Sequence, residues 1–154
     1  MEPTRGTFLV THTDDESAIL RDVVDGQLHT LSSNPGVDRG DVLHATLEPD
    51  LPLAVIWELV DLEECRSIEL GESEEPPTRL ALDAASEQEL GDVTRIERAG
   101  TGEIHVISVP PGRTERAVAD VLADEETIAR AARLGVERVD VRSTPGVVSV
   151  RYLP

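Results

Sequence analysis

The first half of the chain alternates apolar and polar residues in short runs that are separated by turn-forming residues. Alternation with a period of two is typical of β-strands with one buried face. Asp25-Gly26 is a strong hairpin signal, and Asn34-Pro35-Gly36 predicts another turn. The runs predict five strands, at residues 7–12, 17–23, 27–31, 42–47 and 53–62. Short strands at regular spacing favour a small barrel, which the pattern leaves open as SH3-like or OB-like.

The second half combines helical periodicity with strand patterns. Thr78 predicts the N-cap of a helix that runs to about Arg98. The nearly continuous apolar run at 104–109 predicts a strand that is buried on both faces. Residues 114–134 predict two consecutive helices that end before Gly135, and residues 138–152 predict a closing hairpin. The resulting order is α-β-α-β-β, with a right-handed crossover between the first two strands.

Net charge divides the chain at an acidic stretch that ends in two prolines. Residues 1–78 hold 4 Arg and 18 Asp or Glu, a net of −14, whereas residues 79–154 hold 10 Arg and 13 Asp or Glu, a net of −3. Acidic and proline-containing residues between periodic segments are typical of linkers. We therefore predict an α+β chain with a five-stranded barrel at 1–70, an acidic linker at 71–77 and an α/β domain at 78–154.

The chain has no lysine, because all 14 of its basic residues are Arg, and its net charge is −17. Such a charge destabilises a compact protein by self-repulsion, which halophiles tolerate. The Debye length at about 1 M salt is only about 3 Å, so multimolar salt screens most of that repulsion. The composition therefore predicts a protein of a halophilic organism.

Features of the sequence also predict where the protein resides. Cys65 is the only cysteine, which excludes an internal disulfide and fits a reducing cytosol. The N-terminal residues lack the apolar core of a signal peptide, and no apolar run is long enough to span a bilayer. We expect a cytoplasmic protein that has no membrane partner.

Four segments resemble an uncharacterised family of haloarchaeal proteins, and the resemblance covers the whole chain. They read GTFLVTH, LHTLSSNPG, VLADEETIARAARLGV and PGVVSVRYLP. The resemblance implies an extreme halophile and a cytoplasmic location. It assigns no activity, so it transfers no catalytic or binding residue to this chain.

Motifs for metal, phosphate or nucleophilic chemistry are weak in this sequence. His12, His29 and His44 all fall on predicted barrel strands, where three aligned imidazoles would make a metal site. The alternative is three unrelated strand histidines. The acidic turn at 13–16 lacks the spacing of a calcium loop, and the glycines at 99–103 precede a strand instead of a helix N-terminus. We therefore expect no cofactor and no catalytic site.

Arginines are the most suggestive polar set. Those of the second half gather at two helix ends and on one face of the closing hairpin. The candidates are Arg113, Arg116, Arg130, Arg133, Arg138, Arg142 and Arg151. An open arginine face would contact an acidic partner or RNA phosphates. The alternative is pairing within the chain to acidic neighbours, which are Glu115, Asp120, Glu126, Glu137 and Asp140.

These observations favour a non-catalytic binding or adaptor protein whose partner is a protein. An RNA- or ribosome-associated factor that uses the second-half arginines is the alternative. The barrel is poorly suited to single-stranded RNA, because the chain has only three aromatic residues for base stacking. A small metal-dependent enzyme is the third hypothesis, and it rests on the three histidines alone.

Overall fold

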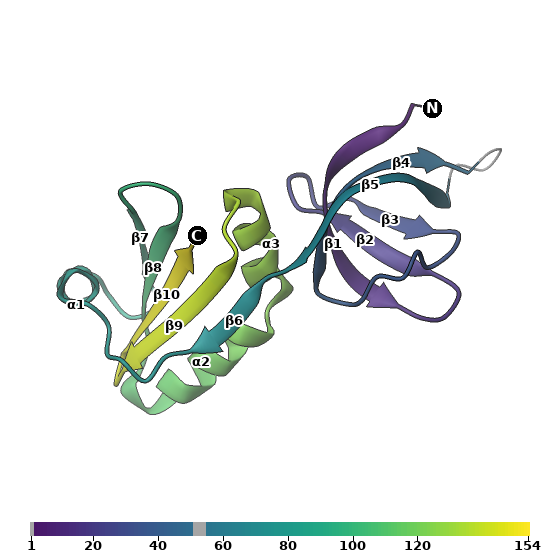
Figure 1. Cartoon of the computed structure of the whole chain (residues 1–154). Coiled ribbons are helices and arrows are strands. Elements are labelled where there is room, and N and C mark those ends of the chain that lie inside the picture. The colour runs from purple at the N-terminus through teal and green to yellow at the C-terminus, as the bar shows by residue number, and fades with distance from the viewer. Residues whose placement is uncertain (1, 51–54) are drawn as a thin grey trace. The chain divides into compact units, whose positions relative to one another are not determined.

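The computed structural model describes residues 2–50 and 55–154, which form two compact units. The first unit contains residues 1–68 and 128–133, and the second contains 69–127 and 134–154. The first unit is a closed five-stranded barrel, and the second is a five-stranded sheet with helices (Figure 1). The mixed α+β fold with an N-terminal five-stranded barrel is therefore confirmed.

The barrel closes in the order β1-β2-β3-β5-β4, and β4 pairs with β1. Its strands are β1 (Thr4–Thr13), β2 (Ala18–Asp22), β3 (Leu28–Leu31), β4 (Asp41–Pro49) and β5 (Trp57–Ser67). The strands β1, β2 and β3 form successive hairpins and β4 returns beside β1, which is a Greek key. An OB-fold is a five-stranded Greek-key barrel, so this order fits the OB-like alternative. Positions 53 and 54 of the predicted fifth strand lie outside the described residues.

The barrel core follows from the alternation in the sequence. Alternate residues of the strands point inward and pack together as one aliphatic and aromatic cluster. It contains Phe8, Val10, Ala18, Leu20, Leu31, Val37, Leu43, Ala45, Leu47 and Trp57. Gly26 has a φ of 77°, which the predicted hairpin turn between β2 and β3 requires.

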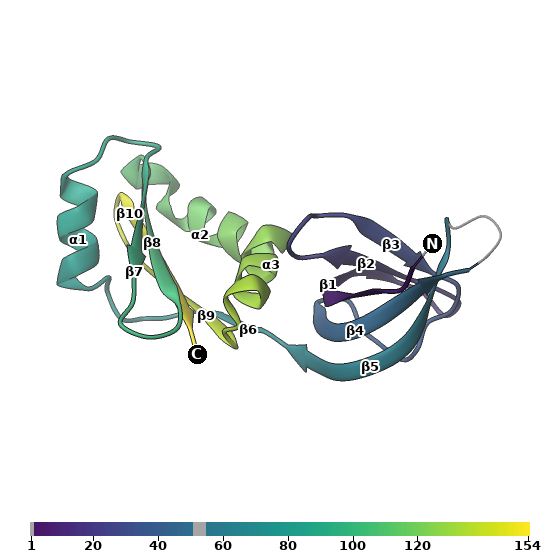
Figure 2. The ribbon, with the colours of Figure 1, turned by 90° about the horizontal axis from the view of Figure 1, so that it is seen from above.

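The second unit contains one sheet in the order β6-β9-β10-β8-β7. Its strands are β6 (Glu69–Glu72), β7 (Val93–Glu97), β8 (Glu103–Ser108), β9 (Arg138–Thr144) and β10 (Val147–Leu153). Figure 2 shows that α1 (Arg79–Ser86) and α2 (Thr114–Ala123) lie on opposite faces of this sheet. The third helix, α3 (Glu125–Leu134), follows α2 after a break at Asp124. The sheet thus keeps one face under α1 and the other under α2.

Several local predictions for the second half are confirmed. The hydroxyl of Thr78 accepts a hydrogen bond from Ala81 N at 3.3 Å, as an N-cap does. Asp124 accepts a hydrogen bond from Glu126 N at the start of α3, and Gly135 has a φ of 72° just after its end. The closing hairpin of β9 and β10 also forms as expected.

The prediction that the helix after Thr78 extends to about Arg98 is wrong. The helix ends at Ser86, and Val93–Glu97 form strand β7 instead. The side-chain amide of Gln88 donates to Val106 O and to Ser108 Oγ on β8, which ties the chain to the sheet directly after α1. Gly91 then turns with a φ of 87°. The residues 71 and 72, expected in the linker, belong to β6, which pairs with β9 in parallel.

Within residues 2–50 and 55–154, no helix has the length and apolar character that crossing a membrane requires. The described helices span at most ten residues each, and a transmembrane helix needs about twenty.

Candidate functional site

One face of the sheet in the second unit carries a row of charged side chains on the neighbouring strands β9 and β10. Arg138, Asp140 and Arg142 alternate along β9, so they project from the same face. Arg151 on β10 lies directly opposite Asp140 in the strand register. Arg151 also pairs with Ile104, which packs under α1, so this row lies on the α1 side of the sheet.

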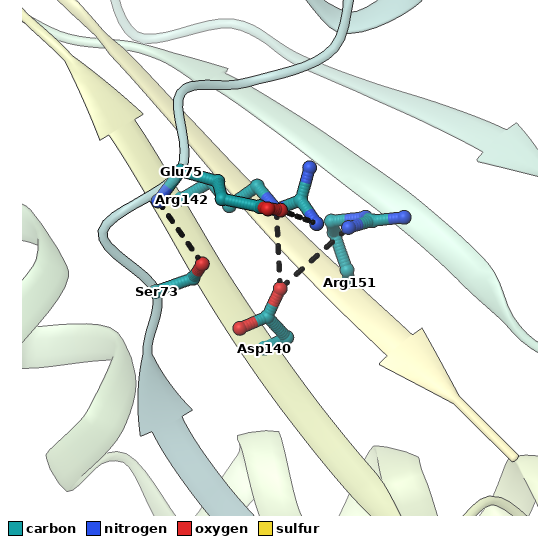
Figure 3. Close-up of polar contacts among 5 residues, drawn as sticks. All are labelled: Ser73, Glu75, Asp140, Arg142 and Arg151. Atoms are coloured by element: carbon teal, nitrogen blue, oxygen red, sulfur yellow. Dashed lines mark hydrogen bonds and ion pairs between the residues drawn. The ribbon is translucent and has the colours of Figure 1, made fainter.

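Two carboxylates pair with this row (Figure 3). Arg142 Nε donates to Asp140 Oδ2 at 3.3 Å, and Arg142 Nη2 lies 2.8 Å from Glu75 Oε2. Arg151 Nη1 lies 3.6 Å from the same Asp140 oxygen. Asp140 therefore sits between two guanidinium groups, and Glu75 reaches the row from the segment that follows β6.

That segment is tied to the sheet by its backbone. Ser73 N donates to Val141 O at 2.8 Å, and the Ser73 hydroxyl accepts from Glu75 N at 3.2 Å. The Glu75 side chain itself is 71% exposed. Glu75 is thus an exposed carboxylate that is presented to Arg142 from outside the sheet.

A fourth arginine comes from the turn between β7 and β8. Arg98 Nη1 donates to Thr101 O at 2.8 Å, which fixes the guanidinium over this turn. Gly102 follows with a φ of 107° and packs against the backbone of Tyr152, the neighbour of Arg151. We call Arg98, Arg138, Arg142 and Arg151 the arginine face.

Charges on the arginine face are not balanced by their neighbours. Burial lowers the pKa of Arg151, and the positive charges of Arg142, Arg98 and Arg138 lower it further, against the opposite effect of Asp140. Arg151 still carries its charge, because arginine is protonated at any physiological pH. Arg142 and Arg151 pair with Asp140 and Glu75, and Glu69 lies opposite Arg138 in the strand register. Four guanidinium groups thus face three carboxylates, in a chain whose net charge is −17.

Arg151 is the least satisfied member of this group. Its side chain is only 17% exposed, and its Nε is buried with no hydrogen-bond partner among the described residues. Its contact with Asp140, at 3.6 Å, is longer than a charge-assisted hydrogen bond of about 2.7–2.9 Å. Buried polar groups in native proteins are rarely left unpaired, so this atom requires an explanation.

The structure separates the seven predicted arginines into different groups. Arg138, Arg142 and Arg151 come together on the arginine face, as the hairpin pattern predicts. Arg113 and Arg116 are exposed near the start of α2. The remaining two, Arg130 and Arg133, belong to the first unit, where Arg133 Nη1 donates to Val23 O at 2.8 Å. Both Arg130 and Arg133 have interaction partners.

Sequence reasoning missed two members of the site. Arg98 was assigned to the end of a helix, and Glu75 was assigned to a linker. A local signal existed only for Arg98, which precedes the glycine-rich turn Gly100-Thr101-Gly102. Of the acidic neighbours that were weighed as internal partners, Asp140 does pair with arginines of the face.

The three barrel histidines occupy different environments. His12 is exposed and contacts Thr11 Oγ1, while His44 contacts Thr7 Oγ1 and lies 3.5 Å from Glu64. His29 is buried in the barrel core. Across the described ranges, no group of three or more His, Cys, Asp or Glu side chains is arranged to hold a metal ion.

Two other candidate motifs have structural roles. Asp14 of the acidic turn accepts hydrogen bonds from Glu16 N and Ser17 N, and these bonds lower the pKa of its carboxyl group. Burial raises the pKa of the Cys65 thiol, and the neighbouring Asp41 carboxylate raises it further. A thiol with a raised pKa is a poor nucleophile at neutral pH.

His29 makes the stability of the barrel depend on pH. It is 2% exposed and stands edge-on between Phe8 and Trp57, with ring centroids 5.5 Å and 4.7 Å away. Burial lowers its pKa below the ordinary 6.5, despite the carboxylates of Asp22 and Asp25. His29 therefore binds a proton near pH 6.5 in the unfolded chain but stays neutral at that pH in the folded barrel. The free energy of unfolding consequently falls as the pH falls below 6.5.

We expect His29→Gln to remove part of this acid sensitivity. The slope that His29 contributes is at most about 1.4 kcal/mol per pH unit below pH 6.5. Urea unfolding between pH 7 and pH 5, followed by Trp57 fluorescence, measures it. His12→Gln is the matched control, because His12 is exposed and should leave the slope unchanged. Equal slopes in the wild type and His29→Gln would contradict this expectation.

Comparison with known proteins supports a family assignment and nothing more specific. A family described as a family of unknown function, DUF5812, matches residues 4–143. No curated protein and no solved structure matches the chain significantly.

Proposed function

The chain belongs to the DUF5812 family, whose function is unknown, and we propose that it is a non-catalytic binding protein that captures an acidic protein partner through the arginine face. The observation that carries this proposal is the imbalance of charge on that face. Four arginines face the three carboxylates of Asp140, Glu75 and Glu69, although acidic residues outnumber basic ones by 31 to 14 over the whole chain. An excess of positive charge in such a protein is suited to an acidic partner.

A protein partner is favoured over RNA by the placement of the aromatic residues. Phe8 and Trp57 lie in the barrel core and Tyr152 is buried in the second unit. The chain has no further Phe, Trp or Tyr, so none of these rings is exposed for an RNA base to stack on. Arginine pairs bidentately with carboxylates, which an acidic protein surface supplies.

Composition supports a proposal about the setting in which the protein works. Absence of lysine, a net charge of −17 and a single cysteine fit the cytoplasm of a halophilic archaeon. At multimolar salt, exposed ion pairs are weakened, whereas partly buried ones keep more of their strength. The partly buried guanidinium groups of Arg142 and Arg151 are suited to such conditions.

The proposal predicts that Arg138→Glu combined with Arg142→Glu abolishes capture of the partner. Affinity should fall at least tenfold, because both changes place negative charge against an acidic surface. Affinity capture from native lysate at multimolar KCl, with and without RNase, measures this loss. Arg113→Glu with Arg116→Glu is the matched control, since it reverses two exposed arginines outside the arginine face.

Circular dichroism must first show that each variant folds. If the double variant does not fold, Arg138→Glu alone remains usable, because Arg138 is exposed. Unchanged capture by a folded double variant would reject the arginine face. Ribosomal components that disappear with RNase would favour the RNA-associated alternative.

A further inference from the structure

We propose that the arginine face contains a seat for one doubly charged oxyanion, a phosphate group of the ligand, held between Arg98, Arg142 and Arg151. This inference rests on the proposed function, since it names the chemistry that is recognised on the same face. It starts from Arg151, whose guanidinium has a single ion pair among the described residues, with Asp140 at 3.6 Å, and whose Nε is buried.

Arg151 has more hydrogen-bond donors than the protein satisfies. A guanidinium group carries five N–H donors and no acceptor. Its Nε is buried and unpartnered within the described part of the chain. A ligand oxygen that accepts from the Nη donors of Arg151 makes hydrogen bonds that the protein leaves unmade.

The excess charge of the arginine face matches a dianion. Arg98, Arg142 and Arg151 are the guanidinium groups of the seat, because Arg138 lies opposite Glu69 on β6. Once the ligand displaces Glu75, Asp140 faces these three groups alone, which leaves two positive charges unbalanced. Burial lowers the pKa of Arg151, and the positive charges of Arg142, Arg98 and Arg138 lower it further, against the opposite effect of Asp140. A carboxylate monoanion would balance half of this charge, whereas a phosphate monoester dianion balances all of it. Guanidinium groups bind phosphate bidentately.

Glu75 occupies the position next to Arg142 that we assign to the ligand. Its carboxylate lies 2.8 Å from Arg142 Nη2, yet its side chain is 71% exposed and comes from the segment after β6 instead of from the sheet. Asp140 is different, because it lies on β9 between Arg142 and Arg151 and is only 25% exposed. We therefore assign Asp140 the role of positioning the two guanidinium groups, and Glu75 the role of a competitor that the ligand displaces.

The test is titration of ¹⁵N-labelled protein with inorganic phosphate in 2 M KCl, read from the arginine Nε–Hε signals. We expect saturable shifts of the Arg142 and Arg151 signals with phosphate, and much weaker shifts with acetate. Arg151→Gln should weaken phosphate binding at least tenfold. Glu75→Gln should strengthen it several-fold, because the competing carboxylate is gone. Absence of saturable phosphate binding by the wild type would overturn the proposal.

Glu75→Gln keeps the proposal testable if Arg151→Gln does not fold, since Glu75 is exposed. Unchanged or weaker phosphate binding by this variant would contradict the role of Glu75 and overturn the seat. Arg79→Gln is the matched control, because it removes one positive charge from α1, where Arg79 pairs with Asp83. Its phosphate affinity should equal that of the wild type.

Two arms distinguish the source of the phosphate and separate this inference from the proposed function. If phosphatase treatment of the lysate abolishes capture, the phosphate is carried by the partner protein. If phosphate binds and capture survives phosphatase treatment, the seat takes a phosphate-bearing small molecule. If phosphate binds but no protein is captured at all, the proposed function fails while the seat stands. If a protein is captured but phosphate does not bind, the seat fails while the proposed function stands.

Discussion

Replacing Gly102 by Ala is expected to destabilise the second unit by roughly 3 kcal/mol or more, which combines overpacking with backbone strain. A Cβ at this position would lie 2.2 Å from Tyr152 O and 3.3 Å from Tyr152 C. These are backbone atoms of β10, a central strand of the sheet, so they cannot move aside as the end of a side chain could. The φ of 107° adds strain for any residue with a Cβ.

Gly100→Ala is the matched control for this change, and it lies in the same turn. Gly100 has a φ of 99°, but a Cβ there would meet no atom within 4 Å. It should therefore cost only the strain of a positive φ, about 1 kcal/mol. Urea unfolding followed by far-UV circular dichroism compares the two variants. Equal losses would show that the contact with Tyr152 does not carry the effect.

The same turn links stability to the proposed site. Gly102 holds the β7–β8 turn against β10, and Arg98 leaves from the start of that turn with its guanidinium bonded to Thr101 O. A displaced turn would move Arg98 away from Arg151. Gly102→Ala should therefore also weaken phosphate binding in any fraction that remains folded, whereas Gly100→Ala should not.

The barrel could be predicted from local pattern alone, because its core depends on alternation. Every second residue of Ala18 to Leu20 and of Leu43 to Leu47 is buried, as the period of two requires. The order of the strands could not be predicted in the same way. Pairing of β1 with β4 and of β3 with β5 joins segments that are far apart in sequence, and turn residues carry no information about such pairing.

The second half shows where local pattern misleads. Leu82, Ala85, Leu90, Val93 and Ile96 have a spacing that is close enough to helical to suggest one long helix. The hydrogen bonds of Gln88 to β8 end that helix, and they are visible only once β8 is in place. Strand β6 could not be predicted for the same reason, since the strand that it pairs with, β9, lies almost seventy residues later in the sequence.

The candidate site was predicted only in part. The residues that were missed depend on contacts between distant segments, which local pattern does not reveal. Arg138, Arg142 and Arg151 share a face because they alternate on neighbouring strands of one hairpin, which local sequence specifies. Arg98 and Glu75 reach that face from a distant turn and from the segment after β6. Local clustering also included Arg130 and Arg133, which belong to the first unit. Proximity in sequence thus identified the arginines of the hairpin. It did not identify Arg98 and Glu75, and it wrongly included Arg130 and Arg133.

Lowering KCl from multimolar to about 0.1 M is expected to destabilise both units, by several kcal/mol in total. Two like charges 10 Å apart repel by about 0.4 kcal/mol in water. The first unit holds 14 Asp or Glu and 6 Arg, a net of −8, and the second holds 17 Asp or Glu and 8 Arg, a net of −9. The Debye length grows from about 3 Å at 1 M salt to about 10 Å at 0.1 M, so many such pairs act at once. Trp57 fluorescence, which reports on the barrel core, and far-UV circular dichroism, which reports on both units, should therefore both show a fall in unfolding free energy.

A single cross-strand pair makes the cause of this salt effect testable. Glu48 on β4 lies directly opposite Glu58 on β5, and both are exposed. Like charges in this position are destabilising by roughly 0.5 kcal/mol. Glu58→Gln should therefore stabilise the barrel at 0.1 M KCl and have little effect at multimolar KCl, where the repulsion is already screened. A gain of the same size at both salt concentrations would point to side-chain packing as the cause.

Screening also explains why a site for an anion in this protein should be partly buried. An exposed arginine loses most of its attraction for phosphate at multimolar salt, because the contact is electrostatic and unprotected. The side chains of Arg142 and Arg151 are each only 17% exposed, so salt screens them less. Raising KCl from 0.5 M to 2 M should therefore weaken phosphate binding at Arg142 and Arg151. It should weaken phosphate contacts with exposed arginines, such as Arg113 and Arg116, by a larger factor. The acidic surface and the partly buried Arg142 and Arg151 then serve one requirement, which is recognition of an anion in concentrated salt.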